Sequence, residues 1–481
     1  MKFAKNLCLT LFTAILAILI LMMSASSSAQ TLTKLADFNG ANGSTPRGAL
    51  TQGTDGNLYG AAIDGGSTGI CYGASGCGLI FQATTAGAIT VMHQFSGTEG
   101  AHPPAAPVLG NDGNFYGTTN RGGTHTNGTF FRMIPDGTVT PLYNFAGAAG
   151  MQPSGGLDLG WDGNFYGTAS YGGAHLNGSI FGITPAGGFK RLYSFCAQSG
   201  CPDGQVPQDG LVQAGDGNFY GVTPAGGADK FGTIFKVTPA GVLATLYTFC
   251  SQTNCADGAT PNVTLVEGRD GNLYGTTEQG GAHGFGTVFR VTRTGTYTIL
   301  HSFCAQPACA DGANPQAGLI LASDFSFYGT TSASASGSRG TIFSITGQGI
   351  FTRLYSFQAS DGQFPSQLTQ ATDGNFYGTM QVGGTGGVGT FFSFSPSLGG
   401  LGPFVKSVES AGKPGSTVII LGNNLTGTAN VAFNGKSTLF TVISDHEVTA
   451  IVPARAMTGA IQVTVAPSTT YSTVTNFKVL P

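Results

Sequence analysis

The sequence predicts an all-β protein: a ring of similar sheets followed by a small second β-domain. Three observations predict it. The segment "DGNFYGTT" at residues 112–119 recurs in six near-copies elsewhere, on average about 53 residues apart. Each interval holds four short apolar runs separated by turn signals, and no stretch has a helical period. Glycine makes up 78 of the 481 residues and charged residues only 9%, which fits short strands joined by tight turns.

The unit at residues 210–261 shows the pattern of four strands. Its apolar runs are "GLVQAG", "FYGVT", "GTIFKVT" and "LATLYTF", and the turns between them contain Asp-Gly-Asn or Pro-Ala-Gly. Four strands in about 50 residues, repeated, are typical of a β-propeller. Seven copies therefore predict a seven-bladed β-propeller over residues 31–395.

The two ends of the repeat region predict how the ring closes. Residues 31–40, "TLTKLADFNG", match the fourth run of a later unit, "TVTPLYNFAG", at half of their positions. The last unit ends after its third run, at residues 389–395. We therefore expect the N-terminal strand to complete the seventh blade, which leaves no open sheet edge.

The repeated octapeptide has two interpretations. In the structural one, Asp and Gly form the turn between the first two strands, and the aromatic residues pack between neighbouring blades. In the functional one, the seven copies form a ring of seven identical binding sites. The residue types favour the structural interpretation, because a calcium site needs more than one carboxylate per turn.

Two family resemblances add to this prediction. The pattern "DGNxYGTTxxGG…GTxFxxTPxG" resembles the tandem GloVer repeat of exported bacterial proteins over residues 31–400, a resemblance that implies the repeat but no particular activity. The segments "GSTVIILGNNL", "VAFNG" and "EVTAIVPARAMTGAIQVTV" are similar to IPT/TIG immunoglobulin-like domains. That similarity implies a β-sandwich over residues 403–481, with a spacer or adhesion role, after a linker at 396–402.

The N-terminus predicts export. Lys2 and Lys5 precede an almost wholly apolar stretch at residues 7–23, and small residues follow up to Ala29. We expect residues 1–29 to be a signal peptide that is cleaved, with an uncleaved anchor as the alternative. Cleavage would leave a chain without a membrane span, secreted or held at the cell surface or in the periplasm.

The cysteines that follow the signal peptide fall into four close pairs. Because their number is even and the chain is expected to be exported, we predict disulfides within each pair. The alternative, a zinc site, needs ligands that converge, whereas each pair belongs to a different repeat unit. No metal or other cofactor is therefore predicted. The pairs are Cys71 with Cys77, Cys196 with Cys201, Cys250 with Cys255, and Cys304 with Cys309.

Binding candidates lie on the face that carries the cysteine loops and the long "GGAH" loops. Loops on a rigid scaffold often carry binding residues. Two partial rings of polar side chains occur there, although an Asp before Gly is often only a turn residue, and a loop His is often simply exposed. The candidates are His125, His175, His283, Asp203, Asp257, Asp311 and Asp361.

These features favour a non-enzymatic binding, adhesion or scaffold protein. Its partner would be an extracellular polysaccharide or a surface protein. No run of Lys or Arg suggests nucleic-acid binding. A propeller hydrolase or lyase acting on a polysaccharide is the alternative, although no catalytic motif is recognisable and no catalytic residue is assigned. The oligomeric state stays open.

Overall fold

The computed structural model describes residues 30–66, 71, 75–333, 339–397 and 400–481. The chain is all-β, and the only helices among these residues are four single 3-10 turns: η1 (Gly147–Ala149), η2 (Thr253–Cys255), η3 (Pro307–Cys309) and η4 (Leu425–Gly427). The predicted signal peptide, residues 1–29, lies outside the described part. No helix in the described part has the length and apolar character needed to cross a membrane.

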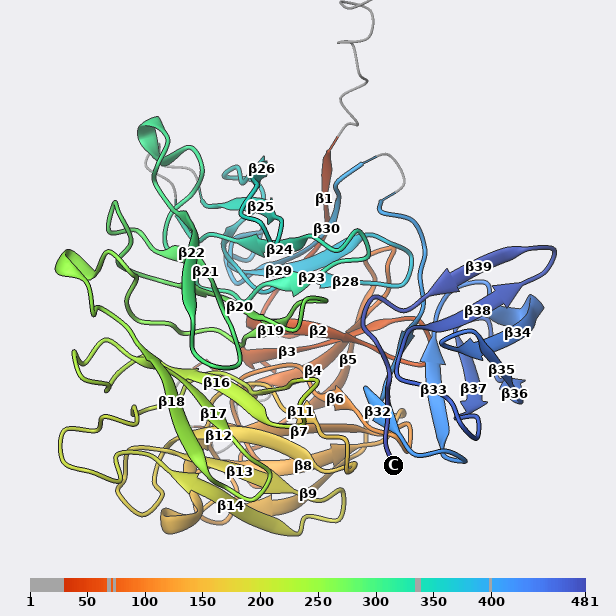
Figure 1. Cartoon of the computed structure of the whole chain (residues 1–481), viewed down its shortest axis with the longest axis horizontal. Coiled ribbons are helices and arrows are strands. Elements are labelled where there is room, and N and C mark those ends of the chain that lie inside the picture. The colour runs from red at the N-terminus through yellow and green to blue at the C-terminus, as the bar shows by residue number, and fades with distance from the viewer. Residues whose placement is uncertain (1–29, 67–70, 72–74, 334–338, 398–399) are drawn as a thin grey trace, which may run out of the picture.

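Residues 31–395 form seven antiparallel sheets of four or five strands within the described part of the chain. The sheets follow one another around a common centre, and β1 lies beside β30 (Figure 1). The first strand of each sheet is the innermost and usually very short. These first strands are β2 (Ser44–Gln52), β6 (Val108–Leu109), β10 (Met151–Pro153) with β11 (Asp158–Leu159), β15 (Val212–Gln213), β19 (Val266–Glu267), β23 (Ile320–Leu321), and β27 (Gln363–Pro365) with β28 (Thr369–Gln370).

The second and third strands are the most deeply buried, because both of their faces are covered by neighbouring sheets. The second strands are β3 (Leu58–Asp64), β7 (Phe115–Thr119), β12 (Phe165–Tyr171), β16 (Phe219–Thr223), β20 (Leu273–Thr277), β24 (Phe327–Thr330) and β29 (Phe376–Val382). The third strands are β4 (Leu79–Ala83), β8 (Thr129–Met133), β13 (Ser179–Ile183), β17 (Thr233–Val237), β21 (Thr287–Val291), β25 (Thr341–Ile345) and β30 (Thr390–Ser395).

The fourth strands form the outer edge, and their residues are half-buried or exposed. They are β5 (Ile89–Gln94), β9 (Val139–Asn144), β14 (Phe189–Ser194), β18 (Leu243–Thr248), β22 (Tyr297–Ser302), β26 (Phe351–Ser356) and β1 (Thr31–Asp37). As the sequence predicts, β1 supplies the outer strand of the last sheet. It pairs antiparallel with β30 from Thr31 opposite Ser395 to Asp37 opposite Thr390.

The C-terminal residues form two further four-stranded sheets and one short parallel pair. The strand orders are β31-β33-β37-β36 and β35-β34-β38-β39, and β32 pairs with β40. Val418, Ile420, Val431, Phe433 and Val463 form their common core. The strands are β31 (Lys406–Ser407), β32 (Ala411–Gly412), β33 (Thr417–Leu421), β34 (Thr428–Phe433), β35 (Lys436–Thr438), β36 (Phe440–Val442), β37 (Glu447–Ile451), β38 (Ile461–Val465), β39 (Thr469–Ser472) and β40 (Lys478–Val479).

Candidate functional site

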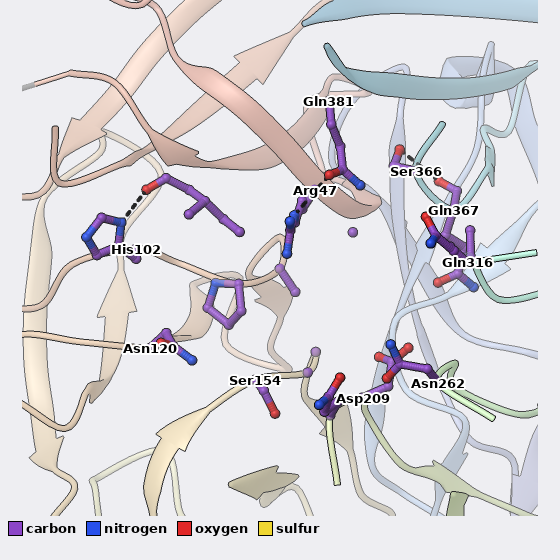
Figure 2. A pocket seen from close by; sticks show the side chains of 18 of the residues that line it. Arg47, His102, Asn120, Ser154, Asp209, Asn262, Gln316, Ser366, Gln367 and Gln381 are labelled. Atoms are coloured by element: carbon purple, nitrogen blue, oxygen red, sulfur yellow. Dashed lines mark hydrogen bonds between the residues drawn. The ribbon is translucent and has the colours of Figure 1, made fainter. Parts of the chain in front are cut away.

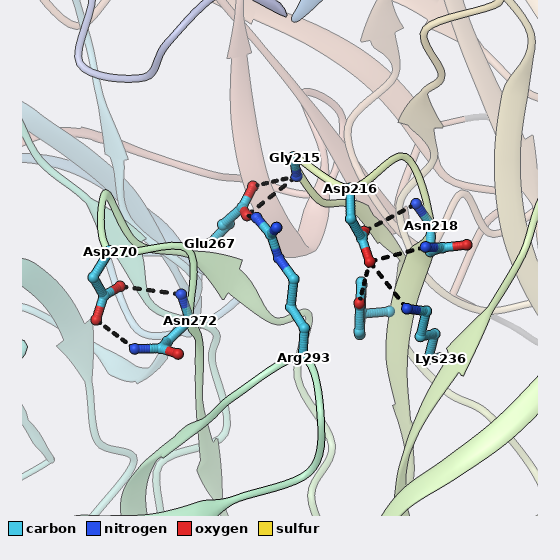
Figure 3. Close-up of polar contacts among 9 residues, drawn as sticks. Gly215, Asp216, Asn218, Lys236, Glu267, Asp270, Asn272 and Arg293 are labelled. Atoms are coloured by element: carbon cyan, nitrogen blue, oxygen red, sulfur yellow. Dashed lines mark hydrogen bonds and ion pairs between the residues drawn. The ribbon is translucent and has the colours of Figure 1, made fainter.

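The repeated octapeptide is a folding element. In the fifth copy, Asp270 Oδ1 accepts a hydrogen bond from the backbone N–H of Asn272 at 3.1 Å, and Oδ2 accepts one from the Asn272 side chain at 2.6 Å (Figure 3). Gly271 has a φ of +74°, which favours glycine. The Tyr274 hydroxyl donates to Asp270 Oδ2 at 2.8 Å. The carboxylate is thus occupied by its own unit, as the structural interpretation requires.

The tyrosine of each octapeptide also joins one sheet to the next. The Tyr274 ring lies 4.0 Å from the ring of Phe327 in the following unit, and Tyr59 and Phe115 are 4.2 Å apart in the same way. The last glycine makes room for a ring of its own sheet, because a Cβ on Gly275 would lie 2.7 Å from Phe289. The octapeptide therefore recurs because each sheet needs the same turn and the same contacts.

Ion pairs reinforce this turn in the fourth and fifth units along the chain. Lys236 Nζ lies 3.0 Å from Asp216 Oδ2. Glu267 accepts hydrogen bonds from the Gly215 N–H at 3.1 and 2.9 Å and pairs with Arg293, so that one unit's carboxylate holds the turn of the unit before it (Figure 3).

The four aspartates that the sequence proposes as binding candidates organise the loops between sheets. Asp257 and Asp311 are fully buried, Asp361 is 9% exposed, and Asp203 is half-buried. Each accepts a hydrogen bond from an aromatic or imidazole group on the preceding outer strand. The donors are the Tyr193 hydroxyl to Asp203 (2.8 Å), Tyr247 to Asp257 (2.8 Å), His301 Nε2 to Asp311 (3.0 Å) and Tyr355 to Asp361 (3.1 Å).

These carboxylates also accept from backbone N–H groups at the start of the same loop. Asp257 accepts from Ser251 at 2.9 Å and from Gln252 at 3.2 Å, and Asp311 accepts from Ala305 at 3.1 Å. Both oxygens of Asp257 and of Asp311 thus accept hydrogen bonds inside the protein, whereas only Oδ2 of Asp203 does. The tyrosine or histidine stands ten residues before its aspartate in three of these pairs and six residues before it at Asp361. The sequence shows this spacing but not the direction in which the side chains point.

The three histidine candidates lie apart from the central cavity described below. His125, His175 and His283 are exposed, at the tips of the loops that join the second and third strands. None of the three lines that cavity. Their proposed binding role stays a prediction.

All four predicted disulfides are present. They join Cys71 to Cys77, Cys196 to Cys201, Cys250 to Cys255 and Cys304 to Cys309. No group of three or more potential metal ligands converges among the described residues.

A cavity of about 680 Å³ lies at the centre of the ring, on the face that carries the disulfides (Figure 2). Every one of the seven units contributes the residue that follows a repeated proline, at or close to its innermost strand. Sequence reasoning missed this set, although the proline recurs in all seven units and marks it. The seven lining residues are Arg47, Pro104, Ser154, Gln208, Asn262, Gln316 and Ser366.

Backbone conformation places these residues at the centre. The residue before each of the seven prolines has a left-handed φ of 52 to 57°, from Asn314 at 52° to Gln152 at 57°. In six of the seven units its N–H donates to a carbonyl of the preceding unit, as Thr260 does to Phe231 at 2.9 Å. The left-handed residue and its hydrogen bond turn the chain towards the centre of the ring, so that the residue after the proline lines the cavity.

The cavity wall is mainly neutral and polar. Amide side chains from several units line it, including Asn120, Asn262, Gln316, Gln367 and Gln381. Such side chains both donate and accept hydrogen bonds. Tyr171, which is 45% exposed, adds an aromatic ring at the rim.

The acidic side chains of the wall are hydrogen-bonded to the protein. Asp209 Oδ1 accepts from the Gly210 N–H and from the Thr264 hydroxyl, each at 2.8 Å, and Oδ2 accepts from the Thr264 N–H at 2.8 Å. Burial raises the pKa of Asp209 even so. Glu278 accepts from the Gln316 amide at 2.8 Å, and Asp64 accepts from the Ser75 hydroxyl at 3.0 Å.

His102 also lines the cavity and contacts the end of strand β3. Its Nδ1 donates to the Ile63 carbonyl at 2.9 Å and lies 3.5 Å from Asp64 Oδ1 (Figure 2). A carbonyl can only accept, so Nδ1 carries the proton in the neutral ring.

The C-terminal sheets contact the opposite end of the ring, where the octapeptide turns lie. The Asn423 amide donates to the Thr372 hydroxyl at 2.8 Å, and the Lys478 ammonium lies 5.8 Å from the centre of the Trp161 ring. Ile419 and Leu421 pack in one apolar cluster with ring residues that include Phe115. The cavity therefore opens on the face away from the C-terminal sheets.

Comparison with known proteins gives the following. A protein structurally similar over part of the chain is a candidate 6-phosphogluconolactonase from Bacteroides uniformis, with 16% identity, a TM-score of 0.44, and coverage of 69% of this chain and 92% of that one. A protein of unknown function from Dyadobacter fermentans has 11% identity and a TM-score of 0.40, with coverage of 76% of this chain and 98% of that one. The PQQ-bound aldose sugar dehydrogenase of Streptomyces coelicolor has 13% identity and a TM-score of 0.36, with coverage of 76% of this chain and 98% of that one. No curated protein sequence matched.

The family model of the Gloeobacter/Verrucomicrobia repeat matches residues 21–202, 106–324 and 305–475. These overlapping matches cover nearly the whole chain and confirm the resemblance seen in the repeat motif. The chain belongs to the Gloeobacter/Verrucomicrobia repeat family.

Proposed function

We propose that this protein is an exported, non-enzymatic binding protein that holds a saccharide in its central cavity. The observation that carries the proposal is the composition of the wall: one residue from each of the seven units, with amide and hydroxyl side chains prevailing. A volume of about 680 Å³ lies within the roughly 300–1,000 Å³ typical of small-molecule sites.

The chemistry of the wall matches that of a sugar. Each sugar hydroxyl is both a donor and an acceptor, and Asn and Gln side chains offer both functions at one position. A sugar ring also has an apolar C–H face that can stack on an aromatic ring. Tyr171 has such a ring, 45% exposed, at the rim of the cavity.

We infer that the sheets of residues 31–395 form a seven-bladed β-propeller and that residues 403–481 form an immunoglobulin-like domain of the IPT/TIG type, joined by a linker at 396–402. Seven consecutive antiparallel sheets and the pairing of β1 with β30 support the first inference. Two packed four-stranded sheets with a shared core support the second.

The proposal includes export through the N-terminal segment. Four disulfides within one chain are typical of proteins that fold in an oxidising compartment. A polysaccharide at the cell surface or in the medium would then be the natural source of the ligand, with a surface protein as the other partner expected from the sequence.

A hydrolase or lyase acting on a polysaccharide is the second candidate. One observation favours it: Asp64, Asp209 and Glu278 all reach the cavity wall, and burial raises the pKa of Asp209, which favours the protonated form that a general acid needs. Incubation of an oligosaccharide that binds, followed by chromatography, would show new products in that case and unchanged ligand in the binding case.

The proposal can be tested with a substitution that places a large side chain in the cavity. Gly156 lines it, has an ordinary φ, and has no atom closer than 3.8 Å to an added Cβ. The Gly156→Phe variant should therefore fold and exclude the ligand. In a screen of oligosaccharides with the protein from residue 30 to 481, we expect saturable binding that this variant abolishes.

The matched control is Val242→Phe, at a position that is 66% exposed in the hairpin between β17 and β18, on the other face. It should bind as the unmodified protein does, and both variants should keep the same thermal unfolding midpoint. Undiminished binding by a folded Gly156→Phe variant would overturn the cavity as the site. Binding of a surface protein but no saccharide would overturn the ligand class.

A further inference from the structure

We infer that the saccharide bound in the central cavity is acidic, and that Arg47 binds its carboxylate. The inference rests on the proposed function and deepens it. It starts from the charged side chains of the wall, which differ in whether the protein already satisfies them.

Arg47 is the single charged residue in the set of seven that follow the repeated prolines. The equivalent residues are uncharged: Pro104, Ser154, Gln208, Asn262, Gln316 and Ser366. A sheet needs no cation at this point, since six units form without one. The charge is thus a property of the cavity rather than of the repeat.

Only the Nε atom of the Arg47 guanidinium makes a hydrogen bond to the described residues. Its Nε donates to Gln381 Oε1 at 3.2 Å. Neither terminal nitrogen has a hydrogen-bond or ion-pair partner within the described residues, and the side chain is exposed. Figure 2 shows Arg47 beside Gln381, among the residues that line the cavity.

This arrangement fits a carboxylate. An arginine whose Nε is occupied still presents its two terminal nitrogens side by side, and a carboxylate accepts two such parallel hydrogen bonds. The carboxylates of the wall do not pair with Arg47, because Asp64, Asp209 and Glu278 accept hydrogen bonds from neutral groups of the protein. The terminal nitrogens of Arg47 are therefore left for a ligand.

Other residues that line the cavity supply the rest of a site for a uronic acid. Asn262 and Gln316 face the same cavity and can bind ring hydroxyls, and Tyr171 can stack on the ring. A sulfate or phosphate ester on a sugar would also attract Arg47, so the test must separate these anions from a carboxylate.

The test compares a matched pair of ligands by isothermal titration calorimetry at low ionic strength. Oligogalacturonides carry a carboxylate on each residue, and their carboxyl-reduced forms are the same chains without charge. We expect the acidic form to bind roughly 10- to 100-fold more tightly, as for hydrogen bonds between charged groups. The difference should shrink as salt is added.

Two variants and one control assign the effect to Arg47. Arg47→Gln should bind both ligands with the affinity of the reduced form, and Arg47→Lys should keep only part of the preference, because a lysine lacks the fork. Arg353→Gln is the control, since Arg353 is exposed on the outer strand β26 and donates to the Ala310 carbonyl at 3.1 Å. It should keep the full preference.

The outcomes separate this inference from the proposed function. Equal affinity for both ligands, lost in Gly156→Phe, would overturn the acidic ligand and leave the cavity as a saccharide site. Tighter binding of a sulfated galacto-oligosaccharide with the same dependence on Arg47 would overturn the carboxylate. Absence of binding to every saccharide would overturn the inference together with the proposed function.

Discussion

At the scale of single residues, the same local contacts and backbone conformations recur in each of the seven units. The Tyr-to-Asp hydrogen bond of the octapeptide and the left-handed residue before each repeated proline are the two clearest. The first was predictable in part, since an Asp-Gly-Asn sequence indicates a turn. The second was not, because threonine, valine and phenylalanine give no signal of a left-handed φ.

The left-handed position of Val206 leads to a stability prediction. Its φ of 54° is unfavourable for a β-branched residue, at a cost of roughly 1–2 kcal/mol. Asparagine tolerates this conformation and occupies the equivalent position at Asn314. We expect Val206→Asn to raise the free energy of unfolding by about 1 kcal/mol in urea titrations. Val242→Asn, at an exposed site with ordinary φ, should leave the free energy of unfolding unchanged. An equal gain in both variants would contradict the explanation by the left-handed φ of Val206.

The octapeptide tyrosines predict how stability depends on pH. Burial, and then the hydrogen bond to Asp112 or Asp270, raise the pKa of Tyr116 and of Tyr274 to about 12. A pKa raised on folding stabilises the protein below the unfolded value of about 10, and this contribution is lost as the pH rises towards 12.

We therefore expect the urea midpoint to fall between pH 10 and 12, while tyrosinate absorbance of the folded protein lags behind that of the 15 tyrosines in the unfolded chain. Parallel titration curves for folded and unfolded protein would contradict this expectation.

At the scale of elements, the loops between sheets are held by a disulfide and a buried aspartate together. The Cys250–Cys255 bond closes a loop with a sequence separation of 5, and Asp257 accepts hydrogen bonds inside the same loop. The even cysteine count and close spacing were enough to predict the bond. They could not show that Asp257 faces inward, which depends on packing by the neighbouring sheet.

The double variant Cys250→Ser/Cys255→Ser should lose about 2 kcal/mol of unfolding free energy, because so short a loop restricts the unfolded chain only modestly. Urea titration of the oxidised protein measures this value, and reduction of the unmodified protein provides the comparison. A loss below about 0.5 kcal/mol would show that Asp257 holds the loop alone. The denatured, unreduced protein from residue 30 to 481, which lacks Cys8, should also show no free thiol.

At the scale of the whole molecule, the cavity and both chain connections lie at opposite ends of the ring. Thr31 pairs with Ser395, so the chain enters the ring beside the point where it leaves for the C-terminal sheets. Those sheets contact octapeptide turns at Gly56, Trp161 and Thr372. The cavity therefore opens at the end of the ring away from Thr31 and from the C-terminal sheets.

The contact between ring and C-terminal sheets can be monitored at the single tryptophan. Leu421 is 2% exposed and packs against ring residues, so Leu421→Asp would place a charge in an apolar contact. Because Lys478 lies over the Trp161 ring, we expect separation to change the tryptophan emission. Lys436→Asp, on an exposed strand of the same sheets, should leave emission unchanged. Unchanged emission in Leu421→Asp would contradict a close contact.

The number of repeats, the strand count in each unit and the closing strand could all be read from the sequence, because each depends on local patterns. The cavity could not, since its wall combines residues from seven units that are distant in the sequence. The recurring proline is the signal that marks this set in the sequence, whereas the loop histidines and aspartates are the more conspicuous polar residues.

We propose above all that the ligand binds at the axis of the ring and not on the outer loops. A crystal structure of the protein with an oligogalacturonide tests this most directly. We expect ligand density inside the cavity, within hydrogen-bond distance of Asn262 or Gln316 and with a carboxylate at Arg47. Ligand density against the loops of His175 and His283, with an empty cavity, would contradict it.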